Sequence, residues 1–205
     1  DEDKLANSPL EAMFRGDMRY ADQFGDYISD AYYDHQRDQV DAELAELATI
    51  DRGLLTPINA LAAEVFELSL QRTKEEMTPE MVALSVVRPV DHFRGFHTFY
   101  PTFSSGQSAA PFKTVADYEN ALKRHDGYIT FMGAAEGRFR QGMESGVVDT
   151  KLTIGIVIQQ LDTQLATPID ESPFMGPTKD FPADFSEADK ARFTDDYRAK
   201  TEQIY

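Results

Sequence analysis

The segment that decides the fold is residues 114–167, TVADYENALKRHDGYITFMGAAEGRFRQGMESGVVDTKLTIGIVIQQLDTQLAT. Apolar side chains recur in it at steps of three and four residues, which places them along one side of an α-helix. Gly146 stands where the first run ends, and glycine readily takes the left-handed conformation that closes a helix. The segment therefore predicts two long helices folded back on each other at Gly146. The apolar positions are Tyr128, Phe131, Met132, Ala135, Phe139 and Met143, then Ile154, Ile158, Leu161 and Leu165.

The beginning of the second helix has a competing interpretation. The Ile and Val residues of 151–158 also suit a β-strand. The helical period continues through residues 159–165, however, and this favours a helix over the whole run.

Further helices are predicted from their N-terminal signals, a Ser or Thr cap that is in several cases followed by Pro. One spans about 29–49 and another about 56–77, and a short one ends before Pro89, which disfavours helical angles at Arg88. The caps are Ser8, Ser29, Thr56, Thr78 and Ser186.

Apolar side chains mark one side of two of these helices, and in the first they form a narrow seam typical of helices that pack on helices. In the helix at 29–49 the seam is Tyr33, Val40, Leu44 and Leu47. In the helix at 56–77 we expect the buried side to be formed by Ile58, Leu61, Val65 and Leu68.

Residues 87–113 break the helical pattern, because they concentrate aromatic residues and two histidines around several Gly, Ser and Pro residues. We predict a long aromatic-rich loop there, and loops of this length in a compact domain are usually functional. Residues 168–185 are a second irregular, Pro-rich stretch. The sequence thus predicts an all-α protein, a bundle-like array of long antiparallel helices in a single domain over residues 1–205.

The charge of the chain limits its partners. It carries 36 Asp and Glu against 20 Lys and Arg, a net charge of −16, and residues 1–51 hold −10 of it. Because phosphate binding needs clustered basic residues, we exclude nucleic acid as a partner. The chain has no cysteine, which excludes disulfides and thiolate metal sites. It also has no run of 18 apolar residues that would span a membrane.

The histidines do not form a recognisable catalytic or metal motif. His92 and His97 are five residues apart, and a metal would need a third ligand, so the favoured interpretation is structural or surface imidazoles. No strand–Gly-x-Ser-x-Gly–helix pattern accompanies the serines that follow. We therefore predict no catalytic residue, no metal ligand and no cofactor in this chain.

Basic and aromatic residues of the loop are the candidates for substrate binding, because loops on rigid scaffolds tend to carry binding sites. They are His92, Arg94, His97 and Tyr100. Arginine forks could bind a carboxylate, but the favoured interpretation is that the arginines of this acidic chain pair with its own Asp and Glu. The arginines in question are Arg88, Arg94, Arg138 and Arg140.

Short sequence elements in a fixed order carry a family resemblance. They are Ser8-Pro9, Gly16-Asp17, Arg19-Tyr20, Ile50-Asp51, Leu54-Leu55-Thr56, the segment Gly95–Phe103, Phe112 to Tyr118, Gly142 with Gly146, Gln160-Leu161, Glu171 to Phe174, and Phe181-Pro182. In this order the chain resembles the N-terminal portion of the bacterial domain-of-unknown-function 885 family.

The resemblance implies a function outside this chain. Members of the family are commonly exported, almost wholly helical and considerably longer, and they resemble gluzincin-type zinc metallopeptidases. Their His-Glu and Pro-Gly-His motif lies in the C-terminal half and is absent here, so zinc would belong to that missing half. The family therefore implies a non-catalytic wall or cover of a peptide cleft, partnered by the rest of its own chain in the periplasm or outside the cell. We accordingly expect a trimmed N-terminus and a natural chain that continues past Tyr205.

Two alternatives remain open. The chain could be a freestanding helical module that binds a peptide or a partner helix in a groove lined by Phe93, Phe96, Phe99 and Phe103. It could also be a complete enzyme that uses His92, His97 and a carboxylate.

Overall fold

The computed structural model describes residues 5–93 and 95–205, and within these ranges it contains helices and no strand. The predicted all-α class is therefore confirmed. The α-helices are α2 (Pro9–Phe14), α3 (Asp30–Ala48), α4 (Pro57–Glu76), α5 (Pro79–Ser85), α6 (Phe96–Phe103), α7 (Val115–Ser145), α8 (Lys151–Ala166) and α9 (Glu187–Ile204). Short 3₁₀ helices are η1 (Arg52–Leu54), η2 (Ile169–Glu171) and η3 (Pro173–Thr178).

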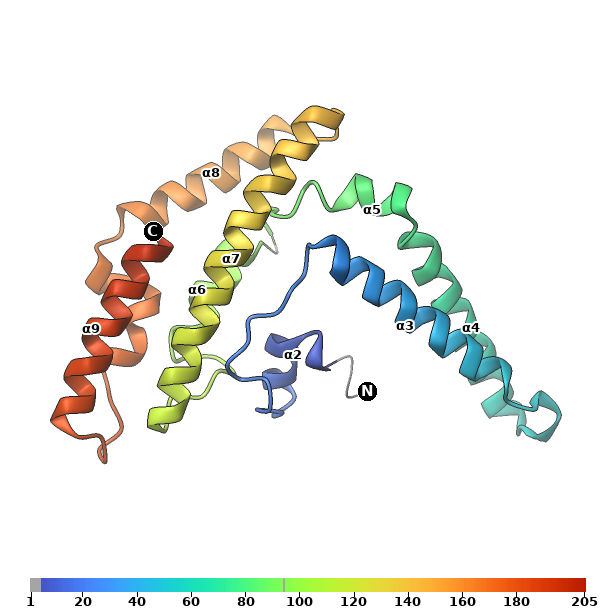
Figure 1. Ribbon diagram of the computed structural model, residues 1–205, viewed down its shortest axis with the longest axis horizontal. Coiled ribbons are helices and arrows are strands. Elements are labelled where there is room, and N and C mark those ends of the chain that lie inside the picture. Colours follow the sequence, from blue (N-terminus) through green and yellow to red (C-terminus); the bar gives the residue numbers. More distant parts are fainter. Residues whose placement is uncertain (1–4, 94) are drawn as a thin grey trace.

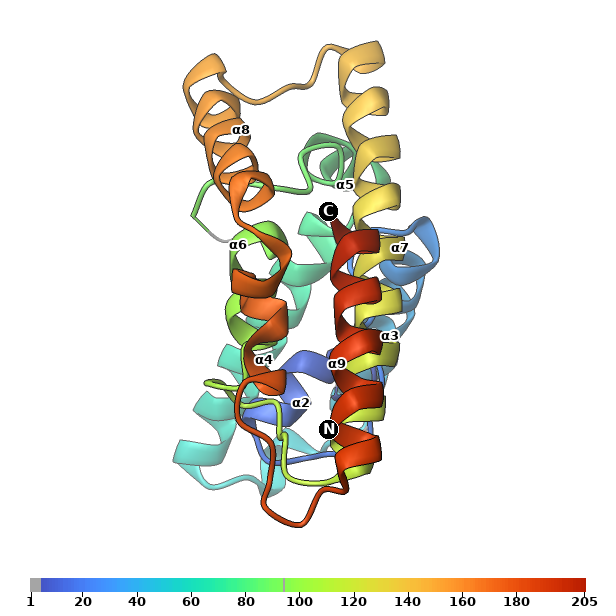
Figure 2. The ribbon, with the colours of Figure 1, turned by 90° about the vertical axis from the view of Figure 1, so that its left-hand side faces the viewer.

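The helices form an arch with two unequal sides (Figure 1). On one side α3 and α4 make an antiparallel hairpin, residues 30–76, which we call the arm. On the other side α6, α7, α8 and α9 gather with α2 and the segment before α3, and we call this part the body. Within the body α9 packs against α7 and η3, whereas α8 turns back after the end of α7 and diverges from it along its length (Figure 1 and Figure 2).

Several predicted N-caps are formed in the structure, whereas Ser8 and Thr78 stand at the N-cap positions without a side-chain cap hydrogen bond. The Ser29 side chain accepts a hydrogen bond from the N–H of Tyr32, and Ser186 does the same for Asp189. Thr114 and Asp117 form a reciprocal capping box at the start of α7, which satisfies two otherwise unpaired N–H groups. At the other end of α7, Gly146 has φ 78°, the left-handed conformation that the sequence predicted.

The core of the body is dominated by aromatic rings around Phe24. The Phe24 ring lies 5.0 Å from that of Tyr100 and 5.5 Å from that of Phe131, in edge and tilted contacts. A second cluster joins the start of α7 to α9 through Tyr118, Phe193 and Tyr197. The arm has only a small cluster of its own, formed by Val40, Leu47 and Leu70.

The structure corrects the predicted loop at 87–113, because its middle is the helix α6. Phe96, Tyr100 and Phe103 are spaced by four and three residues, which is a helical period that the surrounding Gly, Ser and Pro residues obscured. Pro101 lies inside this helix.

The predicted buried side of α4 is also wrong. Ile58, Leu61, Val65 and Leu68 are 71%, 56%, 59% and 50% exposed, and the residue that α4 buries is Leu70. The reason is that α4 contacts α3 with the opposite side, where Ala63 and Leu70 meet Leu44 and Leu47.

The glycines of α7 differ in how closely other parts of the chain approach them. A Cβ on Gly142 would lie 2.7 Å from the carbonyl oxygen of Val147 and 3.0 Å from that of Val87, so glycine lets both of these backbone segments approach α7 closely. Gly133 and Gly137 have nothing within 4 Å and permit no such approach.

Candidate functional site

The N-terminal end of α6 is built around Gly95. A Cβ at this position would overlap the imidazole of His97 and lie 2.6 Å from the carbonyl oxygen of Asp91. Gly95 therefore lets the fully buried His97 ring lie directly over the backbone that leads into the helix.

Two glutamines of α8 hold this end of α6 in place. The Oε1 atom of Gln160 lies 2.8 Å from Nε2 of His97, and its Nε2 donates to the carbonyl oxygen of His92 at 3.1 Å. Gln164 donates to the carbonyl oxygen of His97 at 2.6 Å. In a regular helix this carbonyl would accept from the residue four positions later, but Pro101 has no N–H. Gln164 thus replaces the donor that Pro101 lacks.

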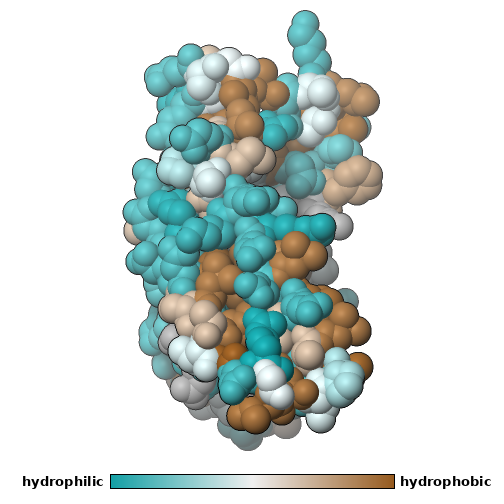
Figure 3. Space-filling model, turned by 90° about the vertical axis from the view of Figure 1, so that its right-hand side faces the viewer, coloured by the Kyte–Doolittle hydropathy of each residue, from teal (hydrophilic) through white to brown (hydrophobic). Residues whose placement is uncertain are grey.

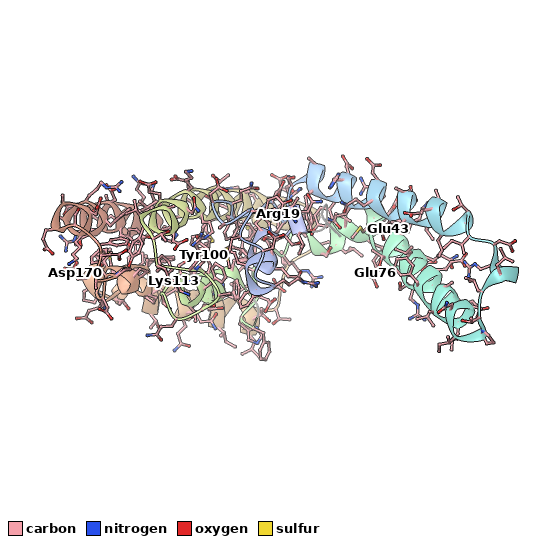
Figure 4. All side chains as sticks on the ribbon, turned by 90° about the horizontal axis from the view of Figure 1, so that it is seen from below. Arg19, Glu43, Glu76, Tyr100, Lys113 and Asp170 are labelled. Carbon is pink, nitrogen blue, oxygen red and sulfur yellow. The ribbon has the colours of Figure 1, made fainter. Side chains whose placement is uncertain are left out.

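Tyr100 lies in the interior of the body (Figure 4), where its partner comes from α7. Its hydroxyl lies 2.9 Å from Nδ1 of His125, and both side chains are buried. Burial raises the pKa of Tyr100, and burial, reinforced by the positive charges of Arg124 and Lys200, lowers the pKa of His125 to about 3. Both groups are therefore neutral at physiological pH.

Arg124 lies in the same interior. Its side chain is fully buried, donates to the carbonyl oxygen of Ala21 and places its guanidinium carbon 5.9 Å from the centre of the Phe103 ring. Burial lowers its pKa, although a guanidinium remains charged near neutral pH. Because these groups are enclosed between α6, α7 and the segment before α3, they stabilise the packing and are not presented to a ligand at the surface.

The structure thus brings together two of the four predicted site residues. His92 is half-buried and shares Gln160 with His97, whereas Tyr100 faces α7. Arg94 lies outside the described residues. Substrate binding by these residues stays a prediction.

A shallow hollow on the outer side of α6 is the feature nearest to the predicted aromatic groove. It has a volume of about 410 Å³ and is lined by Phe93, Thr98, Phe99, Thr102, Phe103 and Ser108, which we call the aromatic face. Phe93 is 82% exposed, whereas Phe96 turns inward and lies 4.9 Å from Phe131. Phe14, which is distant in the sequence, extends this surface, since its exposed ring lies 5.6 Å from that of Phe103.

A second apolar site lies between α7 and α8, where the two helices diverge. One cavity of about 310 Å³ is lined by Val87, Phe139, Met143, Val148, Asp149, Ile154, Val157, Ile158 and Leu161. A neighbouring cavity of about 190 Å³ is lined by Tyr128, Met132, Leu161, Gln164, Leu165, Ile204 and Tyr205. Leu161 lines both, and we call the pair the α7–α8 crevice. The apolar stripe predicted for these two helices is therefore only partly covered, since Met143, Ile158 and Leu165 remain more than half exposed.

The arginines that could have bound a carboxylate ligand have partners within the chain. Arg138 pairs with Asp30 at 2.6 Å and donates to the carbonyl oxygen of Ile28, and Arg140 pairs with Glu136 at 2.6 Å. The predicted internal pairing is confirmed for these two. Arg88 lies 4.0 Å from Asp149, a longer ion pair, and donates to the carbonyl oxygen of Leu84 at 2.9 Å.

Two features are absent from the described part of the chain. Its His, Asp and Glu residues form no group of three or more that could hold a metal ion. Among the helices of residues 5–93 and 95–205, none combines the length and apolar content needed to cross a membrane.

The fold and these surfaces define an all-α protein that exposes apolar side chains at the aromatic face and in the α7–α8 crevice. The chain matches the model of the family described as bacterial protein of unknown function (DUF885) over residues 9–205, and it belongs to that family. The predicted family membership is confirmed. No curated protein and no solved structure matches the chain.

Proposed function

We propose that this chain is the non-catalytic N-terminal helical region of a longer, exported bacterial protein of the zinc-metallopeptidase type. In this proposal it forms one wall or cover of a cleft that binds a peptide substrate. Zinc and the residues that activate water belong to the C-terminal part of the same protein, which is also the partner of this region.

The observation that carries the proposal is the open α7–α8 crevice. Burial of apolar surface stabilises a protein by roughly 25 cal/mol per Å², so a crevice lined by Met143, Ile158 and Leu165 favours a covering partner. Contiguous exposed apolar surface commonly marks an interaction or ligand-binding site.

The crevice has the chemistry expected of such a wall. Asp149 is the one ionisable group that lines the larger cavity, and the remaining lining residues there are apolar. Ligand pockets typically have volumes of about 300–1,000 Å³ and are mainly apolar. The larger cavity is therefore of a size to receive an apolar side chain of the covering segment or of a peptide.

Substitutions on α8 test the proposal in the full-length natural protein. Ile158→Asp places a charge in the crevice, and Leu152→Asp is the matched control, since Leu152 is 75% exposed on the same helix and does not line either cavity. We expect Ile158→Asp to lower the Tm of the full-length protein by several degrees or to raise KM for a peptide at least tenfold, with little effect of Leu152→Asp. Unchanged Tm and KM in Ile158→Asp would contradict the proposal, as would a full-length protein without zinc.

A freestanding binding module is the second candidate, and the aromatic face favours it. A hollow lined by exposed phenylalanines suits an aromatic or proline ring of a peptide. We expect N-acetyl-phenylalaninamide to shift the NMR signals of Thr98 and Thr102, and Phe93→Ala to abolish these shifts while Leu152→Ala leaves them intact. Shifts that persist in Phe93→Ala would exclude this surface.

A further inference from the structure

The helix α4 has two apolar sides, and only one of them is used within the arm. Leu70 packs against Val40 and Leu47 of α3. The other side carries Ile58, Leu61, Val65 and Leu68, all of which are at least half exposed. We call these four residues the α4 seam. Apolar side chains interrupt the hydrophilic surface on the side of the molecule that the arm forms (Figure 3).

The spacing of the seam restricts its partner to a helix. The four residues follow one another at steps of three, four and three, which is the a/d pattern of a coiled coil. In such a seam each side chain fits between four side chains of a facing helix. Over α4 the seam extends about 15 Å at 1.5 Å per residue, a length that about three turns of a partner helix would cover.

The charge of the arm restricts the partner further. Residues 30–76 contain 11 Asp and Glu against 4 Lys and Arg, a net charge of −7. Three of the four basic side chains are already paired within the arm, in the ion pairs Arg37–Asp34, Arg52–Glu67 and Lys74–Asp41. A second copy of this chain would bring an equally acidic arm against the first, and like charges disfavour such a pair.

We propose that the α4 seam binds a basic amphipathic α-helix of a partner polypeptide, with the apolar side of that helix on the seam and its Lys or Arg residues beside the acidic arm. The bound helix and the α3–α4 hairpin would form a three-helix unit in which α4 is central. This inference does not depend on the α7–α8 crevice or on the peptidase-type function.

A designed peptide tests the chemistry on the 205-residue chain. The probe is a fluorescein-labelled peptide of about 21 residues, with Leu at the a and d positions and Lys at the e and g positions of three heptads. Lysines at these positions disfavour pairing of the peptide with itself. A control peptide carries Glu in place of each Lys and keeps the same apolar seam.

We expect saturable binding of the Lys peptide by fluorescence anisotropy, at least tenfold weaker binding of the Glu peptide, and weaker binding at high salt because salt screens exposed charges. Leu61→Asp and Val65→Asp should each weaken binding at least tenfold, and circular dichroism would verify that both variants remain folded. Leu152→Asp, in the body, should bind as the unsubstituted chain does.

Three results of the binding assay would overturn the inference. The first is the absence of saturable binding of the Lys peptide. The second is binding of the Lys peptide by Leu61→Asp and Val65→Asp as tight as by the unsubstituted chain. The third is binding of the Glu peptide as tight as that of the Lys peptide. Dimers of the chain in sedimentation that Leu61→Asp abolishes would also overturn it, because the occupant would then be a second copy.

Discussion

The body and the arm are built from similar amphipathic helices, but they bury them to different extents. In the body, five aromatic rings from α6, α7 and the segment before α3 surround Phe24, and α7 buries residues along most of its length. In the arm, a core of Val40, Leu47 and Leu70 joins only two helices, and the α4 seam is left exposed. An apolar pattern therefore predicts a helix and its apolar sides, whereas the tertiary partners determine which of these sides is buried.

Truncation of Phe24 should give the largest effect, because this ring is central to the body. We expect Phe24→Ala to reduce the free energy of unfolding by about 3–5 kcal/mol, measured by urea denaturation followed by circular dichroism. A loss below about 1 kcal/mol, within the range of surface substitutions, would show that the body is packed as loosely as the arm.

Two leucines of α4 compare a buried with an exposed position within the arm. Leu70 is 5% exposed and Leu68 is 50% exposed on the same helix. We expect Leu70→Ala to cost about 2–4 kcal/mol and Leu68→Ala to cost less than about 1 kcal/mol, since it removes little buried surface. Equal losses in urea denaturation would mean that the seam is covered in solution.

The fold could be predicted from the sequence to the extent that its signals are local. Capping residues such as Ser29, Thr114 and Ser186, and the stop at Gly146, are recognisable within one helical turn, and the corresponding helices were correctly predicted. The α6 helix was missed because Pro101 argues against a helix, and the compensating donor, Gln164, is 63 residues away. The α4 seam was assigned to the interior because no local signal distinguishes its two apolar sides.

Less of the candidate site than of the fold could be predicted from the sequence, because its interactions are not local. His97 and Tyr100 lie one turn apart on the same helix, but their partners Gln160 and His125 come from two different helices. Only the tertiary structure therefore shows that the two side chains face different neighbours. The ring of Phe14, which borders the aromatic face, carries no local signal that links it to α6.

The buried His125 makes the body sensitive to acid in a way that the arm is not. Its pKa is about 3 in the folded protein, against about 6.5 in an unfolded chain. Between these values the unfolded state binds the additional proton, so stability is lost as the pH falls below about 6.5, by up to roughly 1.4 kcal/mol per pH unit. We expect urea denaturation at pH 7, 6 and 5 to show this slope, and the ring signals of His125 in NMR to remain unchanged. The slope should diminish in His125→Gln, and a ring that titrates near pH 6.5 would contradict the burial.

Two glycines allow the same small substitution, Gly→Ala, to be compared at a closely packed position and at an open one. A Cβ at Gly95 overlaps His97, whereas Gly155 in α8 has nothing within 4 Å. Gly95→Ala should therefore destabilise the protein by about 1–3 kcal/mol, because the His97 ring and its contact with Gln160 must shift. Gly155→Ala should instead stabilise it by about 0.5–1 kcal/mol, since alanine restricts the unfolded chain and favours the helix. Thermal unfolding of the two variants gives the comparison directly: opposite changes in Tm support the tight anchoring of α6, and a gain in both would show that the His97 ring does not lie over Gly95 in solution.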